Sequence, residues 1–187
     1  MSIRILTLVG SLRAGSYNRQ LAEAAVKHAT DGLDVEIFEG LAEVPFYDED
    51  LDQPAPVPDQ ARALRNAVQR ADALLLVTPE YNGSIPAVLK NAIDWTSRPF
   101  GNGVIVDKPV AVVGTSSGQY GGAWAHEETR KTARIAGAHV LDSIALSIPR
   151  AAERFATNHP ADDDDVTATI TEILATLAAA PRATTKE

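Results

Sequence analysis

Five short runs of aliphatic and β-branched residues recur along the chain, and a polar segment follows each of them. Continuous apolar runs of this length are typical of β-strands that are buried on both faces of a sheet. The predicted strands are residues 3–9, 34–39, 71–78, 108–115 and 138–148. Asp142 interrupts the last run and predicts a bulge or break there.

Between these runs the apolar residues adopt helical spacing. Leu21, Ala24, Ala25 and His28 predict a helix that follows the loop 10–16 and extends to about Thr30. The other predicted helices are residues 58–70, 85–97, 122–136 and 162–179. Residues 39–57 hold three prolines and several acids, which predicts a long surface loop with at most a short turn.

Strands that alternate with helices predict a parallel sheet covered by helices on both faces, because right-handed crossovers place helices on each side. We therefore expect one three-layer α/β domain over residues 1–187, with strand order 2-1-3-4-5 and a frayed tail from about residue 181.

The composition of the chain excludes several classes of binding partner. The 187 residues carry a net charge of −8 and no cysteine. This charge repels nucleic acid and anionic membranes, and the missing thiols exclude disulfides and cysteine nucleophiles. The apolar run at the N-terminus is too short for a signal peptide, and no transmembrane segment is evident. We expect a cytoplasmic protein.

Three strand-to-helix loops hold most of the unusual residues. They are "GSLRAGSYN" at 10–18, "TPEYNGS" at 78–84 and "GTSSGQYGG" at 114–122. In the expected strand order these loops follow three neighbouring strands. They should therefore meet at the carboxyl edge of the sheet, where α/β proteins bind ligands.

The first loop predicts an anion site. Ser11, Ser16 and Asn18 offer hydrogen bonds, and Arg13 adds a cation beside a helix N-terminus. The alternative is that Ser16 or Asn18 only caps the helix while Arg13 is solvated.

The same loop resembles a P-loop in its glycine spacing alone. Gly10 and Gly15 fit G-x-x-x-x-G-K-[ST], but Ser16 and Tyr17 stand where lysine and serine or threonine are needed. A single terminal phosphate suits the loop better than a triphosphate.

In the second loop, Pro79 fixes the strand exit and Asn82-Gly83 permits a turn with positive backbone φ. Tyr81 offers a flat face or a hydroxyl, and Glu80 a carboxylate, near the same place. Alternatively, Tyr81 packs against the neighbouring helix.

The third loop formally matches the G-x-S-x-G nucleophile elbow, with Ser116 as nucleophile and Asp142 and His159 as conceivable partners. Further glycines prolong the loop where an elbow needs an immediate helix. The loop is better explained as close backbone approach to a flat ligand, with Ser116 and Ser117 as hydrogen-bond donors. No histidine stands at metal-ligand spacing, so no metal site is predicted.

The segments "GSLRAGSYNRQLA", "TPEYNGSIPAVLKNAIDW" and "GTSSGQYGGA" closely resemble the NADPH-dependent FMN reductase family, whose flavodoxin-like members include quinone, chromate and azo-dye reductases. The resemblance covers residues 1 to about 125. It implies an FMN cofactor, NADPH or NADH as co-substrate, a small-molecule electron acceptor and a homodimer or homotetramer. By this resemblance the cofactor-binding candidates are Ser11, Arg13, Ser16 and Asn18 toward the phosphate, and Pro79, Glu80, Tyr81, Asn82, Gly83, Ser116, Ser117 and Gly118 toward the isoalloxazine. Tyr17 is a further cofactor-binding candidate.

The leading hypothesis is an FMN-dependent NAD(P)H oxidoreductase that passes two electrons through flavin N5 to quinone, flavin, azo or metal-oxyanion acceptors. Such an enzyme needs no obligate acid or base. The alternatives are a flavodoxin-type electron carrier and a serine hydrolase that uses Ser116.

Overall fold

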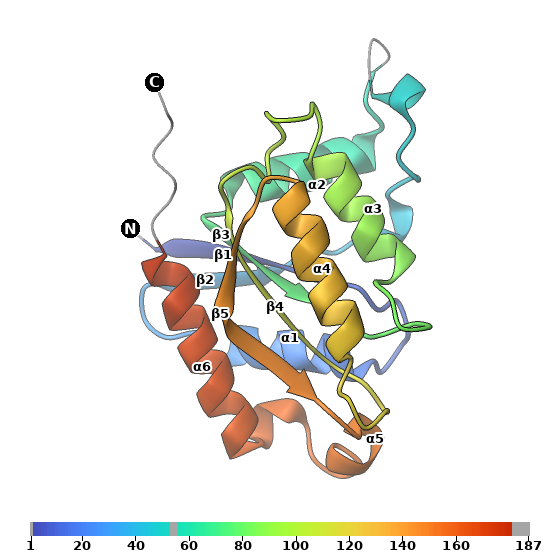
Figure 1. The fold of residues 1–187 in the computed structure, drawn as a ribbon. Coiled ribbons are helices and arrows are strands. Elements are labelled where there is room, and N and C mark those ends of the chain that lie inside the picture. The colour runs from blue at the N-terminus through green and yellow to red at the C-terminus, as the bar shows by residue number, and fades with distance from the viewer. Residues whose placement is uncertain (1, 53–55, 181–187) are drawn as a thin grey trace.

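The computed structural model describes residues 2–52 and 56–180, so the predicted frayed tail lies outside the described residues. The strands are β1 Ile3–Val9, β2 Leu33–Ile37, β3 Ala73–Val77, β4 Pro109–Thr115 and β5 His139–Ile148. They form one parallel sheet in the order β2-β1-β3-β4-β5 (Figure 1). The predicted fold class and strand order are confirmed.

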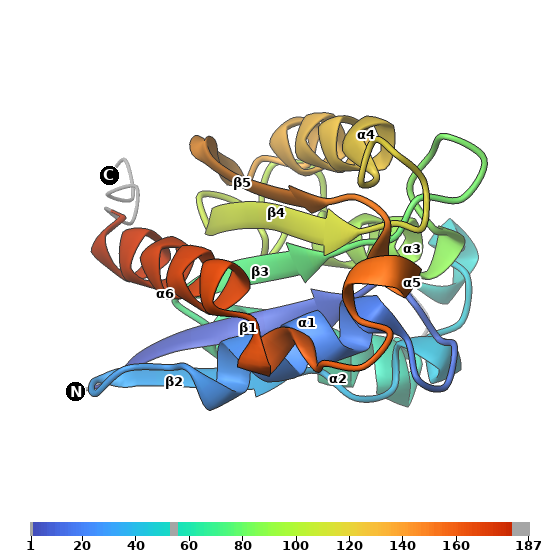
Figure 2. The same cartoon turned by 90° about the horizontal axis from the view of Figure 1, so that it is seen from below.

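Helices cover both faces of this sheet. They are α1 Tyr17–Lys27, α2 Asp59–Arg70, α3 Ala87–Thr96, α4 Ala123–Ile135, α5 Ala151–Arg154 and α6 Asp164–Ala179. Figure 2 shows α1 and α6 on one face and α2, α3 and α4 on the other. Side chains alternate along each strand: Ile5 and Val9 pack with the first group, whereas Leu6 and Leu8 pack with the second.

The predicted irregularity near Asp142 is confirmed. Val110 pairs with Val140, but Val112 already pairs with Ala145, so β5 carries extra residues that β4 does not match. The end of β5 beyond this bulge pairs regularly with β4 again, from Ala145 opposite Val112 to Ile148 opposite Thr115.

Four local predictions need correction. The first helix ends at Lys27 rather than near Thr30, and the last begins at Asp164 because the Asp163 side chain caps it by accepting from the Val166 N–H. The segment predicted as loop with at most one turn forms two short 3₁₀ turns, at Leu41–Glu43 and Glu49–Leu51. Helix α5 was not predicted, since four residues are too few to show a helical period.

A buried ion pair fastens this long loop to the helical layer. The Arg65 guanidinium donates to both Asp52 carboxylate oxygens at 2.6 and 2.9 Å, and its Nε donates to the Trp95 carbonyl at 2.7 Å. The Arg65 side chain is 16% exposed and the Asp52 side chain is 8% exposed. Hydrogen bonding to Arg65 lowers the pKa of Asp52 below its ordinary value.

No helix within residues 2–52 and 56–180 is long and apolar enough to cross a bilayer.

Candidate functional site

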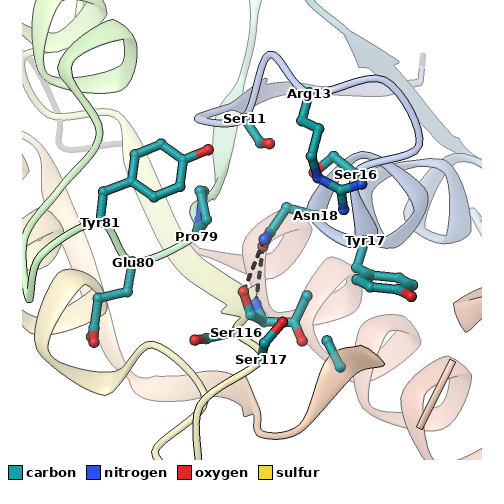
Figure 3. Close-up of a pocket in the computed structure, with 12 residues that line it drawn as sticks. Ser11, Arg13, Ser16, Tyr17, Asn18, Pro79, Glu80, Tyr81, Ser116 and Ser117 are labelled. Atoms are coloured by element: carbon teal, nitrogen blue, oxygen red, sulfur yellow. Dashed lines mark hydrogen bonds between the residues drawn. The ribbon is translucent and has the colours of Figure 1, made fainter. Parts of the chain in front are cut away.

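A cavity of about 220 Å³ lies where the loops after β1, β3 and β4 meet (Figure 3). It is lined by Ser11, Arg13, Ser16, Tyr17, Asn18, Pro79, Glu80, Tyr81, Thr115, Ser116, Ser117 and Ala151. The predicted convergence of the three loops is thus observed. Three candidate residues do not line this cavity but stand close to lining residues in the sequence, namely Asn82, Gly83 and Gly118.

The α1 end of the cavity concentrates positive potential. Ser16 is the N-cap of α1, and its side chain accepts from the Arg19 N–H at 3.4 Å. Ser16 thus caps the helix and also lines the cavity. It leaves the N–H groups of Tyr17 and Asn18 without an acceptor among the described residues. These orphan donors and the helix dipole favour an anion at this point.

Arg13 extends over this helix start. Its guanidinium lies 5.7 Å from the centroid of the Tyr17 ring and donates to the Ala14 carbonyl at 3.3 Å. It makes no ion pair with any carboxylate of the described residues. Figure 3 shows the guanidinium on the side of the cavity where Ser16 and Asn18 lie. An uncompensated cation therefore borders the same anion site.

Asn18 has a structural task that its sequence position did not reveal. Its side-chain Nδ2 donates to the Thr115 carbonyl at 2.9 Å, and the Thr115 N–H donates to its Oδ1 at 2.9 Å. Both groups are buried. This reciprocal pair joins the first loop to the third, so the Asn18 amide is largely committed to holding the cavity together.

Gly114 permits the close approach of the loops. A Cβ at this position would lie 2.0 Å from the Thr78 carbonyl oxygen, 2.6 Å from His126 Nε2 and 3.0 Å from Asn18 Oδ1. A side chain would have to push β3 and β4 apart. The glycine therefore sets how tightly the site closes.

The second loop makes the predicted tight turn. Tyr81 and Ser84 exchange two backbone hydrogen bonds of 3.2 and 3.0 Å around Asn82 and Gly83, whose φ values are 54° and 74°. Two successive positive φ values define a type I′ turn, which Asn-Gly favours. Glu128 of α4 supports it by accepting from Ser84 Oγ at 2.5 Å.

Glu80 and Tyr81 point in different directions from this loop. The Glu80 carboxylate accepts from the backbone N–H groups of Trp124 and Ala125 at 3.1 and 3.2 Å, so it caps α4. Tyr81 is 50% exposed, which contradicts the alternative that it is packed away against a helix. Its ring extends across the cavity mouth toward Ser11 (Figure 3).

The hydrolase alternative is contradicted. Ser116 Oγ accepts from the Gly118 N–H at 3.1 Å. Asp142 is ion-paired with Arg134, and His159 Nδ1 accepts from the Ala161 N–H, so neither reaches the serine. No helix follows Ser116 directly, since α4 begins only at Ala123.

Two lining residues were not predicted. Thr115 directly precedes the serines and could have been included as the last residue of its strand. Ala151 follows β5, and nothing in its type signals a site. Within residues 2–52 and 56–180, no three His, Asp or Glu side chains gather as metal ligands.

Comparison with known protein families identifies the family of this chain. The model of the NADPH-dependent FMN reductase family matches residues 3–153. The chain belongs to this family. Membership confirms the predicted oxidoreductase class and its dependence on FMN and NAD(P)H.

Individual relatives agree. The chain is 45% identical over 130 residues to a 2-hydroxy-1,4-benzoquinone reductase of Burkholderia sp, covering 70% of this chain and 69% of the relative. It is 44% identical over 147 residues to a quinone reductase of Pseudomonas putida, covering 79% and 75%. Among solved structures, the flavoenzyme FerB, an NAD(P)H:(acceptor) oxidoreductase from Paracoccus denitrificans, is similar at a TM-score of 0.81 with 30% identity, over 94% of this chain and 95% of that one.

Proposed function

We propose that this FMN reductase family member transfers two electrons from NAD(P)H through flavin N5 to small-molecule acceptors, namely quinones, flavins, azo compounds or metal oxyanions. The observation that carries the proposal is the pair of orphan N–H groups at Tyr17 and Asn18 beside the unpaired Arg13. A ligand with a terminal phosphate would satisfy all of them. FMN is such a ligand, and relatives of the chain are named as quinone reductases.

The residues at the α1 end suit a phosphate dianion. Ser11 and Ser16 carry hydroxyl donors, Arg13 carries a forked cation, and the helix N-terminus adds backbone N–H groups. Hydrogen bonds to a charged oxygen are about twice as strong as neutral ones, so this end would supply most of the affinity.

The other end suits a flat ring. Pro79 and Tyr81 form one wall, and Ser116 and Ser117 form the opposite wall. At about 220 Å³ the cavity is smaller than a typical cofactor pocket of roughly 300–1,000 Å³. The isoalloxazine would therefore extend over the mouth toward Asn82, Gly83 and Gly118 and leave one face open to the nicotinamide and the acceptor.

FMN, when bound, would supply the two-electron chemistry, so the difficult step belongs to the cofactor. The protein would bind the phosphate, orient the ring and offer backbone N–H groups of the second and third loops to negative charge on the ring. No side chain of the cavity has to act as an obligate acid or base.

We further propose that the protein works in the cytoplasm as a homodimer or homotetramer. The missing cysteines and the need for NAD(P)H support the compartment. Exposed aromatic residues, namely Tyr81 at the cavity and the contacting pair Tyr120 and Trp124, support self-association.

The proposal is tested by reconstitution. The purified apoprotein is titrated with FMN and, as a control without the phosphate, with riboflavin. The complex is then mixed anaerobically with NADPH and afterwards with a benzoquinone. We expect tight FMN binding, weaker riboflavin binding, direct bleaching by NADPH and recovery of colour with the quinone. A protein that binds no flavin, or that bleaches only when a partner reductase is added, would contradict the proposal.

A further inference from the structure

His126 is a buried titratable residue that the proposed chemistry does not use. It lies in the first turn of α4 and is 0% exposed. Its Nε2 lies 3.1 Å from the Thr78 carbonyl oxygen, and its Nδ1 lies 2.7 Å from Ser147 Oγ. A carbonyl can only accept, so Nε2 carries the proton, and Nδ1 of the neutral ring accepts from the Ser147 hydroxyl. The ring thereby bridges the exit of β3 and the end of β5.

The imidazole also fills a space that two glycines leave. A Cβ at Gly114 would lie 2.6 Å from Nε2, and a Cβ at Gly122 would lie 3.1 Å from it. The ring therefore has little freedom to turn. Its position is determined by packing as well as by its two hydrogen bonds.

Thr78 connects His126 to the wall of the cavity. Its N–H donates to the Val113 carbonyl at 2.9 Å, its hydroxyl donates to the Pro79 carbonyl at 2.8 Å, and its own carbonyl accepts from His126. These three hydrogen bonds fix the orientation of the peptide bond between Thr78 and Pro79. Pro79 is in turn one wall of the cavity.

We infer that His126 is a positioning residue for the flavin site: in its neutral form it holds the Thr78–Pro79 peptide in the orientation that bound FMN requires. The inference rests on the proposed function. His126 does not line the cavity, so it acts through Thr78.

Protonation would weaken this arrangement through the buried charge. The Ser147 hydroxyl can turn and accept from a second N–H on the ring, but the new charge would be buried close to Arg130 of the same helix, with the Glu80 carboxylate as the nearby anion. Burial lowers the pKa of His126 to about 4, while the hydrogen bond to Thr78 acts in the opposite direction. FMN should therefore be held less tightly as the pH falls toward this value.

Three variants test the role. His126→Gln keeps a donor of similar reach and cannot take up a proton, His126→Leu removes both hydrogen bonds at similar volume, and Thr129→Val removes a buried hydroxyl one turn along the same helix as a control. At pH 7.5 we expect FMN dissociation constants within about threefold of wild type for the Gln and Val variants and about tenfold or more higher for the Leu variant. Between pH 7.5 and 4 the wild type should lose up to about twofold more affinity than the Gln variant, because about half of the His126 rings are charged at the pKa of about 4.

A measurement on the wild-type apoprotein complements the variants. Nitrogen-15 NMR of the ring should show a neutral imidazole with its proton on Nε2 at pH 7, whether or not a variant folds. In the NMR measurement, a proton on Nδ1 or a charged ring at pH 7 would overturn the role. In the titrations, it would be overturned by a His126→Leu variant with unchanged FMN affinity, or by identical pH profiles of FMN affinity for wild type and His126→Gln. Failure of the wild type to bind FMN at all would instead overturn the proposed function, and this role with it.

Discussion

Replacing Gly114 with alanine tests the packing that brings the three loops together. The added Cβ would lie 2.0 Å from the Thr78 carbonyl oxygen, whereas an ordinary contact is 3.4 Å or more. The neighbouring strands would have to separate by about 1.4 Å, although Thr78 and Val113 are joined there by a 2.9 Å hydrogen bond. Overpacking of this kind costs roughly 3 kcal/mol or more of unfolding free energy.

Gly118→Ala in the same loop is the matched control. Its Cβ would lie 3.5 Å from Ser116 Oγ, which is an ordinary contact. Urea unfolding of both apoproteins should show a loss of roughly 3 kcal/mol for Gly114→Ala and less than about 1 kcal/mol for Gly118→Ala. FMN titration should show weaker binding for the first variant. A Gly114→Ala protein as stable as Gly118→Ala would refute the reasoning.

Further predictions concern the ion pair, the buried imidazole and the phosphate end. Asp52→Asn should lower the free energy of unfolding in urea by about 3 kcal/mol, because Arg65 is left buried without its counter-charge, and an unchanged midpoint would contradict this. The folded-state pKa of His126 lies below its ordinary value of 6.5, at about 4, so the unfolded chain binds this proton more readily and stability is lost as the pH falls through that window. Wild type should lose roughly 2.5 kcal/mol more than His126→Gln between pH 7.5 and 4.5, and equal losses would argue against a buried neutral ring. Arg13→Ala should weaken FMN binding by about 1.5–3 kcal/mol in a fluorescence titration, with little change in riboflavin binding; unaltered FMN affinity would remove Arg13 from the site.

Local patterns were sufficient to predict the architecture. The aliphatic runs mark each strand, and Asp142 marks the bulge because a charged residue interrupts the apolar run there, on an edge strand that is largely exposed. The turn at Asn82-Gly83 was predictable from the glycine and asparagine preference for positive φ. These features depend on neighbouring residues in the chain.

The contacts that shape the cavity depend on residues far apart in sequence. Asn18 pairs with Thr115 across 97 positions, and Glu80 reaches the start of α4 across more than 40. The spacing of residue types does not reveal which polar groups such partners satisfy. For the same reason the sequence did not reveal the bridge that His126 makes.

The most direct test is a crystal structure of the protein grown with FMN. We predict that the phosphate lies at the start of α1, within hydrogen-bonding distance of the Tyr17 and Asn18 N–H groups and of Arg13, with the ring between the Tyr81 side and the Ser116 side of the cavity. Density for FMN at another edge of the sheet, or a phosphate that contacts none of these groups, would contradict the account.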